Sequence, residues 1–218
     1  PSVAMYRHLD ERSAAYFALG VARSTGLPAV LICTSGTAVA NFYPAVIEAY
    51  ESRVPLIVLT GDRPPELRGS GANQTIDQLK IFGDTVHQFV EMPVPQNDAP
   101  DVVRRHVHTI AARVYARACG PPAGPVHVNF PFRKPLEPAV TVSYQAAPSR
   151  RKPAAVPGNA YTEFKRGNLL PTPAQIDELA DVVCSQPHGL IVCGPGCPEH
   201  SFPAAVAALS RITGYPIV

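Results

Sequence analysis

The sequence predicts an α/β fold, a parallel β-sheet flanked by helices, followed by the start of a second α/β domain. Short apolar runs typical of strands alternate with longer segments of helical periodicity, the order expected for parallel strands joined by crossover helices. Polar clusters follow two of the strand-like runs, and open α/β sheets bind ligands at the carboxyl ends of their strands. The same pattern therefore predicts both the fold class and the place of a binding site.

The chain opens with elements that alternate between helix and strand. Residues 29–33 are an uninterrupted apolar run, which predicts a strand buried on both faces. After Thr37, apolar residues recur at helical spacing along one stripe. The elements expected here are a helix over 12–24, a strand over 29–33, a helix over 37–50, a strand over 55–60 and a structured loop over 61–74.

The alternation continues to the end of residues 1–136, which we assign to a first domain. The pattern predicts a strand over residues 85–92, a long helix with Asp98 as its N-cap, and a strand over residues 125–130. One apolar stripe of this helix is expected to face the core, formed by Val103, Val107, Ile110, Val114 and Ala118.

The composition then changes. Residues 137–171 contain prolines, basic residues and polar residues without a sustained period, which predicts an interdomain linker. Thr172, Pro173 and Gln175 then occupy the positions of a helix capping box, and residues 172–218 are expected to begin a central α/β domain.

This second domain is predicted to continue the same alternation. Its first helix should bury one stripe, formed by Ile176, Leu179, Val182 and Val183. The elements expected after it are a strand over 189–193, a helix over 202–212 and a further strand from Tyr215. A domain that stops at the first residues of a buried strand is incomplete, so we expect the chain to be a fragment.

The composition argues against several classes of protein. A formal net charge of +2 gives no support for a nucleic-acid partner, and no apolar stretch reaches the roughly 20 residues of a membrane span. Five cysteines at irregular spacing argue against a disulfide framework and favour the reducing cytoplasm. His106 and His108 are two residues apart on a helix and point in different directions, and no metal site is expected.

Three polar clusters carry the functional signal, each beside the end of an apolar segment. Because parallel strands end at one edge of a sheet, we expect the clusters to converge on one pocket. They are Asp10-Glu11-Arg12 before a helix, Thr34-Ser35-Gly36-Thr37 between a strand and a helix, and Asp62-Arg63-Pro64-Pro65-Glu66 after a strand, with Gly71-Ala72-Asn73-Gln74 soon after.

In this order and at this spacing, the clusters resemble the pyrimidine-binding domain of thiamine-diphosphate enzymes, and most closely the SEPHCHC synthases of menaquinone biosynthesis, the MenD family. The resemblance covers residues 1–135 strongly, and residues 172–218 only as the opening of the family's central domain. It implies a pyrimidine-binding domain over residues 1–136 that lacks its first strand. The matching segments are residues 10–15, 34–45, 62–67 and 71–76.

The resemblance implies a carboligase that decarboxylates 2-oxoglutarate and adds the resulting carbanion to isochorismate. Its cofactors would be thiamine diphosphate and Mg²⁺, with the diphosphate and metal ligands beyond Val218. Active sites in this family form between subunits, which implies a homodimer or homotetramer. The fragment alone is expected to be inactive.

The resemblance also assigns roles to individual residues. Glu11 matches the glutamate that shares a proton with N1′ of the aminopyrimidine, a role that requires a desolvated carboxyl. An apolar setting for it is expected from Ala14, Ala15, Tyr16 and Phe17. The turn formed by Thr34, Ser35, Gly36 and Thr37 would line the aminopyrimidine pocket. The substrate-binding positions would be Arg63, Asn73 and Gln74, and an arginine fork suits the carboxylates of both substrates.

Each cluster also has a purely structural interpretation. Asp10 and Glu11 fit ordinary first-turn acids of a helix. Residues 34–37, the glycine turn, fit a tight strand–helix connection, and Arg63 fits a surface salt bridge to Asp62 or Glu66. Two alternative functions stay open at this point. One is another thiamine-diphosphate-dependent 2-oxoacid decarboxylase or synthase, and the other is a non-catalytic binding module of the same fold.

Overall fold

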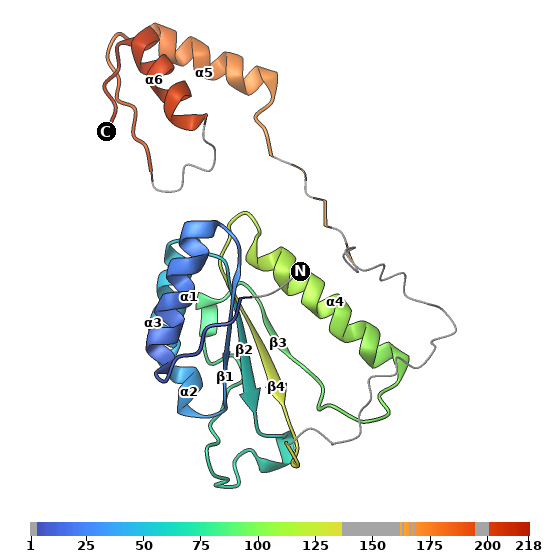
Figure 1. Cartoon of the computed structure of the whole chain (residues 1–218). Helices are drawn as coiled ribbons and strands as arrows, with labels where there is room; N and C mark the ends of the chain where they lie inside the picture. Colours follow the sequence, from blue (N-terminus) through green and yellow to red (C-terminus); the bar gives the residue numbers. More distant parts are fainter. Residues whose placement is uncertain (1–3, 137–161, 163, 166, 168, 195–200) are drawn as a thin grey trace. The chain divides into compact units, whose positions relative to one another are not determined.

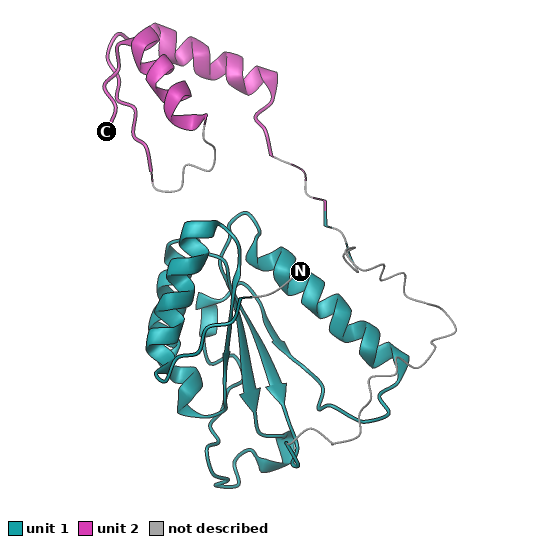
Figure 2. Cartoon of the chain, viewed as in Figure 1, with its two compact units in different colours: residues 1–164 teal, residues 165–218 magenta. Residues whose placement is uncertain are grey.

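The computed structural model describes residues 4–136, 162, 164, 165, 167, 169–194 and 201–218. The chain divides into two compact units, Pro1–Phe164 and Lys165–Val218 (Figure 2). The predicted linker over residues 137–171 lies largely outside the described residues, and its bounds stay a prediction.

The first unit is built on a parallel four-stranded sheet, which confirms the predicted fold class (Figure 1). Its strands follow the spatial order β1-β2-β4-β3, and all three pairings are parallel. The predicted strand over residues 85–92 is much shorter than expected. The strands are β1 (Ala29–Cys33), β2 (Leu56–Asp62), β3 (Phe89–Glu91) and β4 (Pro125–Pro131).

Helices cover both faces of this sheet. Figure 1 shows α1, α2 and α3 on one side and α4 on the other. Side chains alternate along β2, so Val58 joins the apolar core under the first three helices while Ile57 joins the core under α4. The helices are α1 (Glu11–Thr25), α2 (Thr37–Asn41), α3 (Tyr43–Glu51) and α4 (Asp101–Ala118).

The first helix matches its prediction, because local signals define both ends. Asp10 is the N-cap, and its carboxylate accepts a 2.7 Å hydrogen bond from the Ser13 backbone N–H. Gly26 ends the helix in the left-handed conformation, with φ of 68°, which a glycine adopts without strain. Between them, Ala15, Leu19 and Ala22 form the buried face.

The single helix predicted over residues 37–50 is wrong, because the segment forms two helices. The break falls at Phe42, whose side chain is fully buried. Pro44 explains the break: it has no N–H to donate to the carbonyl of Ala40, so the α-helical hydrogen bonds cannot continue through it. The periodicity of the two helices is nearly continuous, which is why the sequence pattern concealed the break.

Three further predictions in this unit are wrong. Strand β1 is not buried on both faces, since Val30 and Ile32 are 53% and 72% exposed. Helix α1, which covers this strand, packs on the face of Leu31. Asp98 is not the cap of α4, which begins at Asp101 after Pro100 without a side-chain cap, and Val107 is exposed rather than buried.

The second unit contains α5 (Pro173–Ser185) and α6 (Phe202–Thr213). The capping box of α5 is confirmed: Thr172 and Gln175 bond each other's backbone N–H groups. The predicted buried stripe is wrong, because Ile176, Leu179 and Val182 are each more than half exposed. In place of two strands, the described residues form one parallel bridge between Ile191 and Ile217.

Strand β4 carries a buried histidine in the core of the first unit. His127 is fully buried, and its ring contacts Phe82 and Phe89 at centroid distances of 4.8 Å and 5.1 Å. Its Nε2 lies 2.7 Å from the hydroxyl oxygen of Thr60, and its Nδ1 has no partner among the described residues. Burial lowers the pKa of His127 to about 4, so the ring is neutral at pH 7.

We predict that His127 makes the fold sensitive to acid. Between pH 6.5 and pH 4 the unfolded chain binds a proton at this ring and the folded chain does not. The free energy of unfolding therefore decreases as the pH is lowered across this window. The loss amounts to about 3 kcal/mol, and nothing is lost above pH 6.5. In His127→Phe this part of the pH dependence should disappear, which urea titrations across the window can measure. An exposed-site control, His106→Phe, should keep the wild-type slope.

Candidate functional site

Glu11 lies at the start of α1, beside the carboxyl end of β1. Its Oε2 accepts a 3.4 Å hydrogen bond from the side-chain amide of Asn41 in α2, and the carboxyl is partly buried. Burial, together with the negative charge of Glu11, raises the pKa of the Cys33 thiol to about 12. The thiol at the end of the strand therefore lies within the electrostatic reach of this carboxylate and stays protonated.

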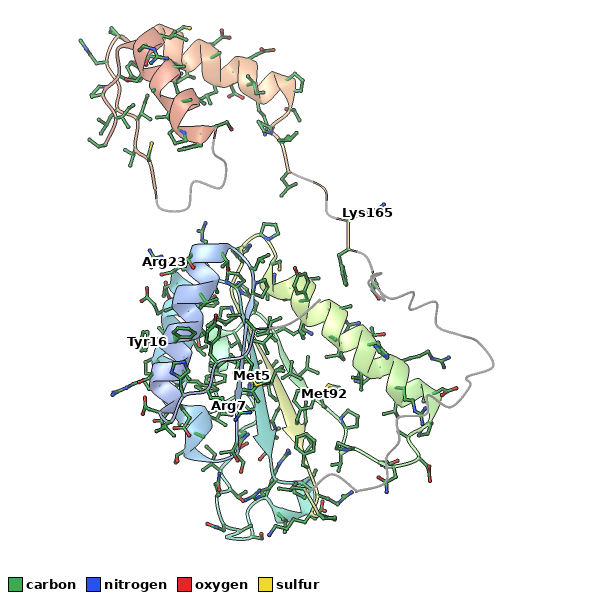
Figure 3. All side chains as sticks on the ribbon, in the orientation of Figure 1. Met5, Arg7, Tyr16, Arg23, Met92 and Lys165 are labelled. Carbon is green, nitrogen blue, oxygen red and sulfur yellow. The ribbon has the colours of Figure 1, made fainter. Side chains whose placement is uncertain are left out.

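The apolar setting predicted around Glu11 is only partly present. Ala15 is fully buried, but Tyr16 and Phe17 are 46% and 41% exposed. Figure 3 shows the Tyr16 side chain on the outer side of α1. Phe17 instead contacts Tyr6 and His8 of the preceding segment, at centroid distances of 5.0 Å and 4.9 Å.

The turn after β1 is hydrogen-bonded to the loop that follows β2. The Ser35 hydroxyl donates to the backbone oxygen of Gln74 at 2.9 Å. In return, the Gln74 side-chain amide donates to the Thr34 hydroxyl at 3.2 Å and to the Ser35 carbonyl at 3.1 Å. The structure thus brings Gln74 against the glycine turn, 40 residues away from Thr34 in sequence.

Gly36 is required at the centre of this turn. Its φ of 82° lies in the left-handed region, and a Cβ there would lie 3.0 Å from the Gln74 side chain and 3.2 Å from its backbone oxygen. Gly36 also donates its N–H to the side-chain oxygen of Gln78 at 2.9 Å. A larger residue would therefore push the loop away from the turn.

Gln78, which the sequence patterns did not single out, holds three segments together. It is fully buried, and its amide nitrogen donates to the Gly61 carbonyl at 3.0 Å and to Asn129 Oδ1 at 2.9 Å. Asn129 also accepts from the Thr60 hydroxyl at 2.8 Å and donates to Asp62 Oδ2 at 2.8 Å. A polar network thus runs through the core beneath the strand ends.

Two groups that can play only one hydrogen-bonding role fix the direction of each bond in this network. An N–H of Gly36 can only donate and a carboxylate of Asp62 can only accept, so the Gln78 oxygen and the Asn129 nitrogen are assigned. The Thr60 hydroxyl has one proton and donates it to Asn129 Oδ1. The contact between Thr60 and His127 therefore requires His127 Nε2 to be the donor and the Thr60 oxygen the acceptor. His127 is therefore the Nε2–H tautomer, and its unpartnered Nδ1 is a buried acceptor.

The three arginines near this edge have different partners. Arg68 forms ion pairs with Asp62 at 2.9 Å and Glu91 at 2.6 Å, and Arg133 forms a two-pronged pair with Glu66. The predicted alternative for Arg63, a salt bridge to Asp62 or Glu66, is therefore wrong.

Arg63 makes a weaker set of contacts. Its Nε donates to the Asn73 carbonyl at 3.3 Å, and its backbone N–H donates to Asp62 Oδ1 at 2.7 Å. Arg63 has no carboxylate within ion-pair distance among the described residues. Its guanidinium is held near Asn73 and keeps donors for an anionic group.

A separate pocket of about 520 Å³ is lined by residues next to the carboxyl ends of β2, β3 and β4, together with one residue of α4. Figure 3 shows Met92 on the α4 side of the sheet. This pocket is mainly apolar and contains none of the predicted site residues. Its lining residues are Pro65, Glu91, Met92, Pro93, Val94, His106 and Pro131.

The groups at this edge provide polar and charged contacts of several kinds. Among the described residues, no three His, Cys, Asp or Glu side chains gather closely enough to hold a metal ion. A partly buried carboxyl, polar turn groups and an arginine that pairs with no described carboxylate offer contacts to a ligand with ring nitrogens and to a carboxylate. The described helices also include none long and apolar enough to cross a membrane.

Comparison with known proteins first defines the class. Residues 1–81 match the family described as "Thiamine pyrophosphate enzyme, N-terminal TPP binding domain". This match contains Glu11, the glycine turn and the loop with Arg63 and Gln74, and its domain fold agrees with the parallel sheet flanked by helices.

The chain is, over nearly its whole length, a relative of the enzymes named 2-succinyl-5-enolpyruvyl-6-hydroxy-3-cyclohexene-1-carboxylate (SEPHCHC) synthase. The synthase of Roseiflexus sp. (strain RS-1) is 48% identical over 99% of this chain and 37% of its own length. Those of Haloquadratum walsbyi and Halorubrum lacusprofundi are 47% and 48% identical over 100% and 98% of the chain. These comparisons confirm the resemblance to the MenD family, and the chain spans just over one third of each relative.

We predict that Gly36→Ala destabilises the first unit and releases the loop. The strained φ and the contact with Gln74 should lower the free energy of unfolding by about 1–3 kcal/mol, measured by thermal or urea unfolding. Gly20→Ala is the matched control, because a Cβ at Gly20 meets no atom within 4 Å and the residue lies inside α1. That variant should gain about 0.5–1 kcal/mol, and equal effects at both sites would contradict the prediction.

Proposed function

We propose that the chain is part of a thiamine-diphosphate-dependent SEPHCHC synthase, which decarboxylates 2-oxoglutarate and joins the remaining four-carbon unit to isochorismate. One observation carries the proposal: the carboxyl of Glu11, the turn after β1 and the loop with Arg63 gather at the carboxyl ends of β1 and β2. They lie in a chain that is 42–48% identical to synthases of this name.

Glu11 is proposed to hold the aminopyrimidine of the cofactor. Bound thiamine diphosphate supplies a thiazolium carbon that becomes a nucleophile once it has lost its proton. A carboxylic acid at N1′ of the aminopyrimidine favours the tautomer that removes this proton. The partial burial of Glu11 and the donor at Asn41 support this role, and full enclosure would come from a surface outside the described residues.

The glycine turn and the following loop are proposed to line the two halves of the site. Thr34, Ser35, Gly36 and Thr37 would contact the aminopyrimidine, while Arg63, Asn73 and Gln74 would contact the substrates. The hydrogen bonds of Gln74 to the turn support a shared wall between these halves. Arg63 suits the substrate side because both proposed substrates carry carboxylates, which an arginine fork binds with two hydrogen bonds.

Two further parts of the proposal concern groups beyond this unit. The cofactor diphosphate and Mg²⁺ would be held by residues outside the chain described here. The open position of Glu11 suits a site completed by a second subunit, so the complete enzyme is proposed to be a homodimer or homotetramer. Its activity with 2-oxoglutarate and isochorismate is the direct test, and the absence of that activity would exclude this function.

Glu11→Gln should abolish cofactor activation in the complete enzyme. The amide cannot release or share a proton as the acid does, so exchange of the thiazolium C2 proton should slow by at least about 100-fold, as measured by NMR after acid quench. Asp10→Asn is the matched control, since asparagine also caps a helix and the change is one residue away. Near-normal exchange in Glu11→Gln would remove Glu11 from its proposed role.

Arg63→Lys should weaken substrate binding. The lysine keeps the charge but loses the planar fork, so the KM for at least one of the two carboxylate substrates should rise by about tenfold. Steady-state kinetics with each substrate varied in turn measures the change. Arg133→Lys, in the exposed pair with Glu66, serves as the control and should leave both constants unchanged. If Arg63→Lys also leaves both constants unchanged, Arg63 does not bind substrate.

A further inference from the structure

Gln78 is a buried amide whose three bonds reach three different segments. Its oxygen accepts from Gly36 in the turn after β1 at 2.9 Å. Its nitrogen donates to the carbonyl of Gly61 in β2 at 3.0 Å and to the side chain of Asn129 in β4 at 2.9 Å. The side chain is fully buried, so these partners replace water completely.

Only a carboxamide of this length satisfies all three partners. The site needs one acceptor for a backbone N–H and two donors for two oxygens, which is the inventory of a glutamine side chain. Methionine has a similar shape and supplies neither. Glutamate supplies the acceptor, but as a carboxylate it turns an oxygen toward the oxygens of Gly61 and Asn129. Asparagine is one methylene shorter and cannot span the same gap.

The bonds of Gln78 continue to the backbone of Arg63. Asn129, which accepts from Gln78, donates to Asp62 Oδ2 at 2.8 Å. The other oxygen of Asp62 accepts from the backbone N–H of Arg63 at 2.7 Å. A chain of hydrogen bonds therefore links one buried amide to the glycine turn and to the backbone of Arg63.

We propose that Gln78 is a positioning residue that sets the separation between the turn of residues 34–37 and the Arg63 loop. This inference rests on the proposed function, in which the turn contacts the cofactor and Arg63 contacts a substrate carboxylate. Gln78 itself touches neither ligand, since it is buried beneath both. Its effect on the reaction is therefore geometric and passes through Gly36 and Asn129.

The first test needs no cofactor or substrate. Amide hydrogen exchange of the complete enzyme without ligands should show faster exchange at Gly36 in Gln78→Met, by about tenfold or more, because its N–H loses the buried acceptor. Gln96→Met is the matched control, since Gln96 is exposed. Unchanged exchange at Gly36 in Gln78→Met would overturn the proposal, whatever the enzyme's activity.

The second test separates positioning from general stability. In Gln78→Met the KM for the carboxylate substrates should rise by about tenfold at a temperature where thermal unfolding shows the variant fully folded. A purely structural role would lower the unfolding temperature and leave the KM of the folded enzyme unchanged. That second result would refute the proposal. A wild-type enzyme without synthase activity would refute the proposed function instead. The ligand-free hydrogen-exchange measurement would still test whether Gln78 holds the Gly36 N–H.

Gln78→Glu provides a rescue experiment, including the case in which Gln78→Met does not fold. The protonated acid accepts from Gly36 and donates to one of the two oxygens, and burial between oxygens favours this neutral form. The ratio of its KM to the wild-type KM should therefore fall as the pH is lowered from about pH 8 to about pH 6. A ratio that stays constant over this range counts against the positioning role.

Discussion

The buried amide of Asn129 is the contact on which this edge of the fold depends. Asn129 stands opposite Thr60 in the register of β2 and β4, and it bonds Thr60, Gln78 and Asp62 at once. A buried polar group without partners costs about 1–3 kcal/mol, so the three neighbours must hold compatible positions. Strand register, loop conformation and the turn after β1 are thereby constrained together. The same polar network leaves Nδ1 of His127 without a hydrogen-bond partner among the residues that the structure describes.

The parts of the fold that the sequence predicted are those set by neighbours in the chain. The N-terminus of α1, its end at Gly26 and the capping box at Thr172 depend on residues within four positions of each other. The strands were recognisable as apolar runs, and the polar clusters beside two of them marked the edge at which the site residues gather. The resemblance to the MenD family added the proposed ligands, which no local pattern could supply.

The parts that were missed depend on contacts far apart in sequence. The exposure of Val30 and Ile32 is decided by which helices reach β1, and the proline break between α2 and α3 was hidden by matching apolar stripes. Gln78 lies in a loop without periodicity, 51 residues from its partner Asn129. One signal was available: His127 and Asn129 are polar residues two positions apart in a buried strand, and such residues must find partners on one face.

The three arginines differ in their ion pairs, and this difference affects the electrostatic field at longer range. Arg68 and Arg133 are neutralised by carboxylates, whereas Arg63 has no such partner among the described residues. A partly exposed cation without a direct ion pair acts on passing anions over about 8–10 Å at ordinary ionic strength. Small anions diffusing past would be drawn toward this guanidinium before any hydrogen bond forms. Their capture should therefore slow as salt is added, which makes the rate of encounter, as well as affinity, a property of this loop.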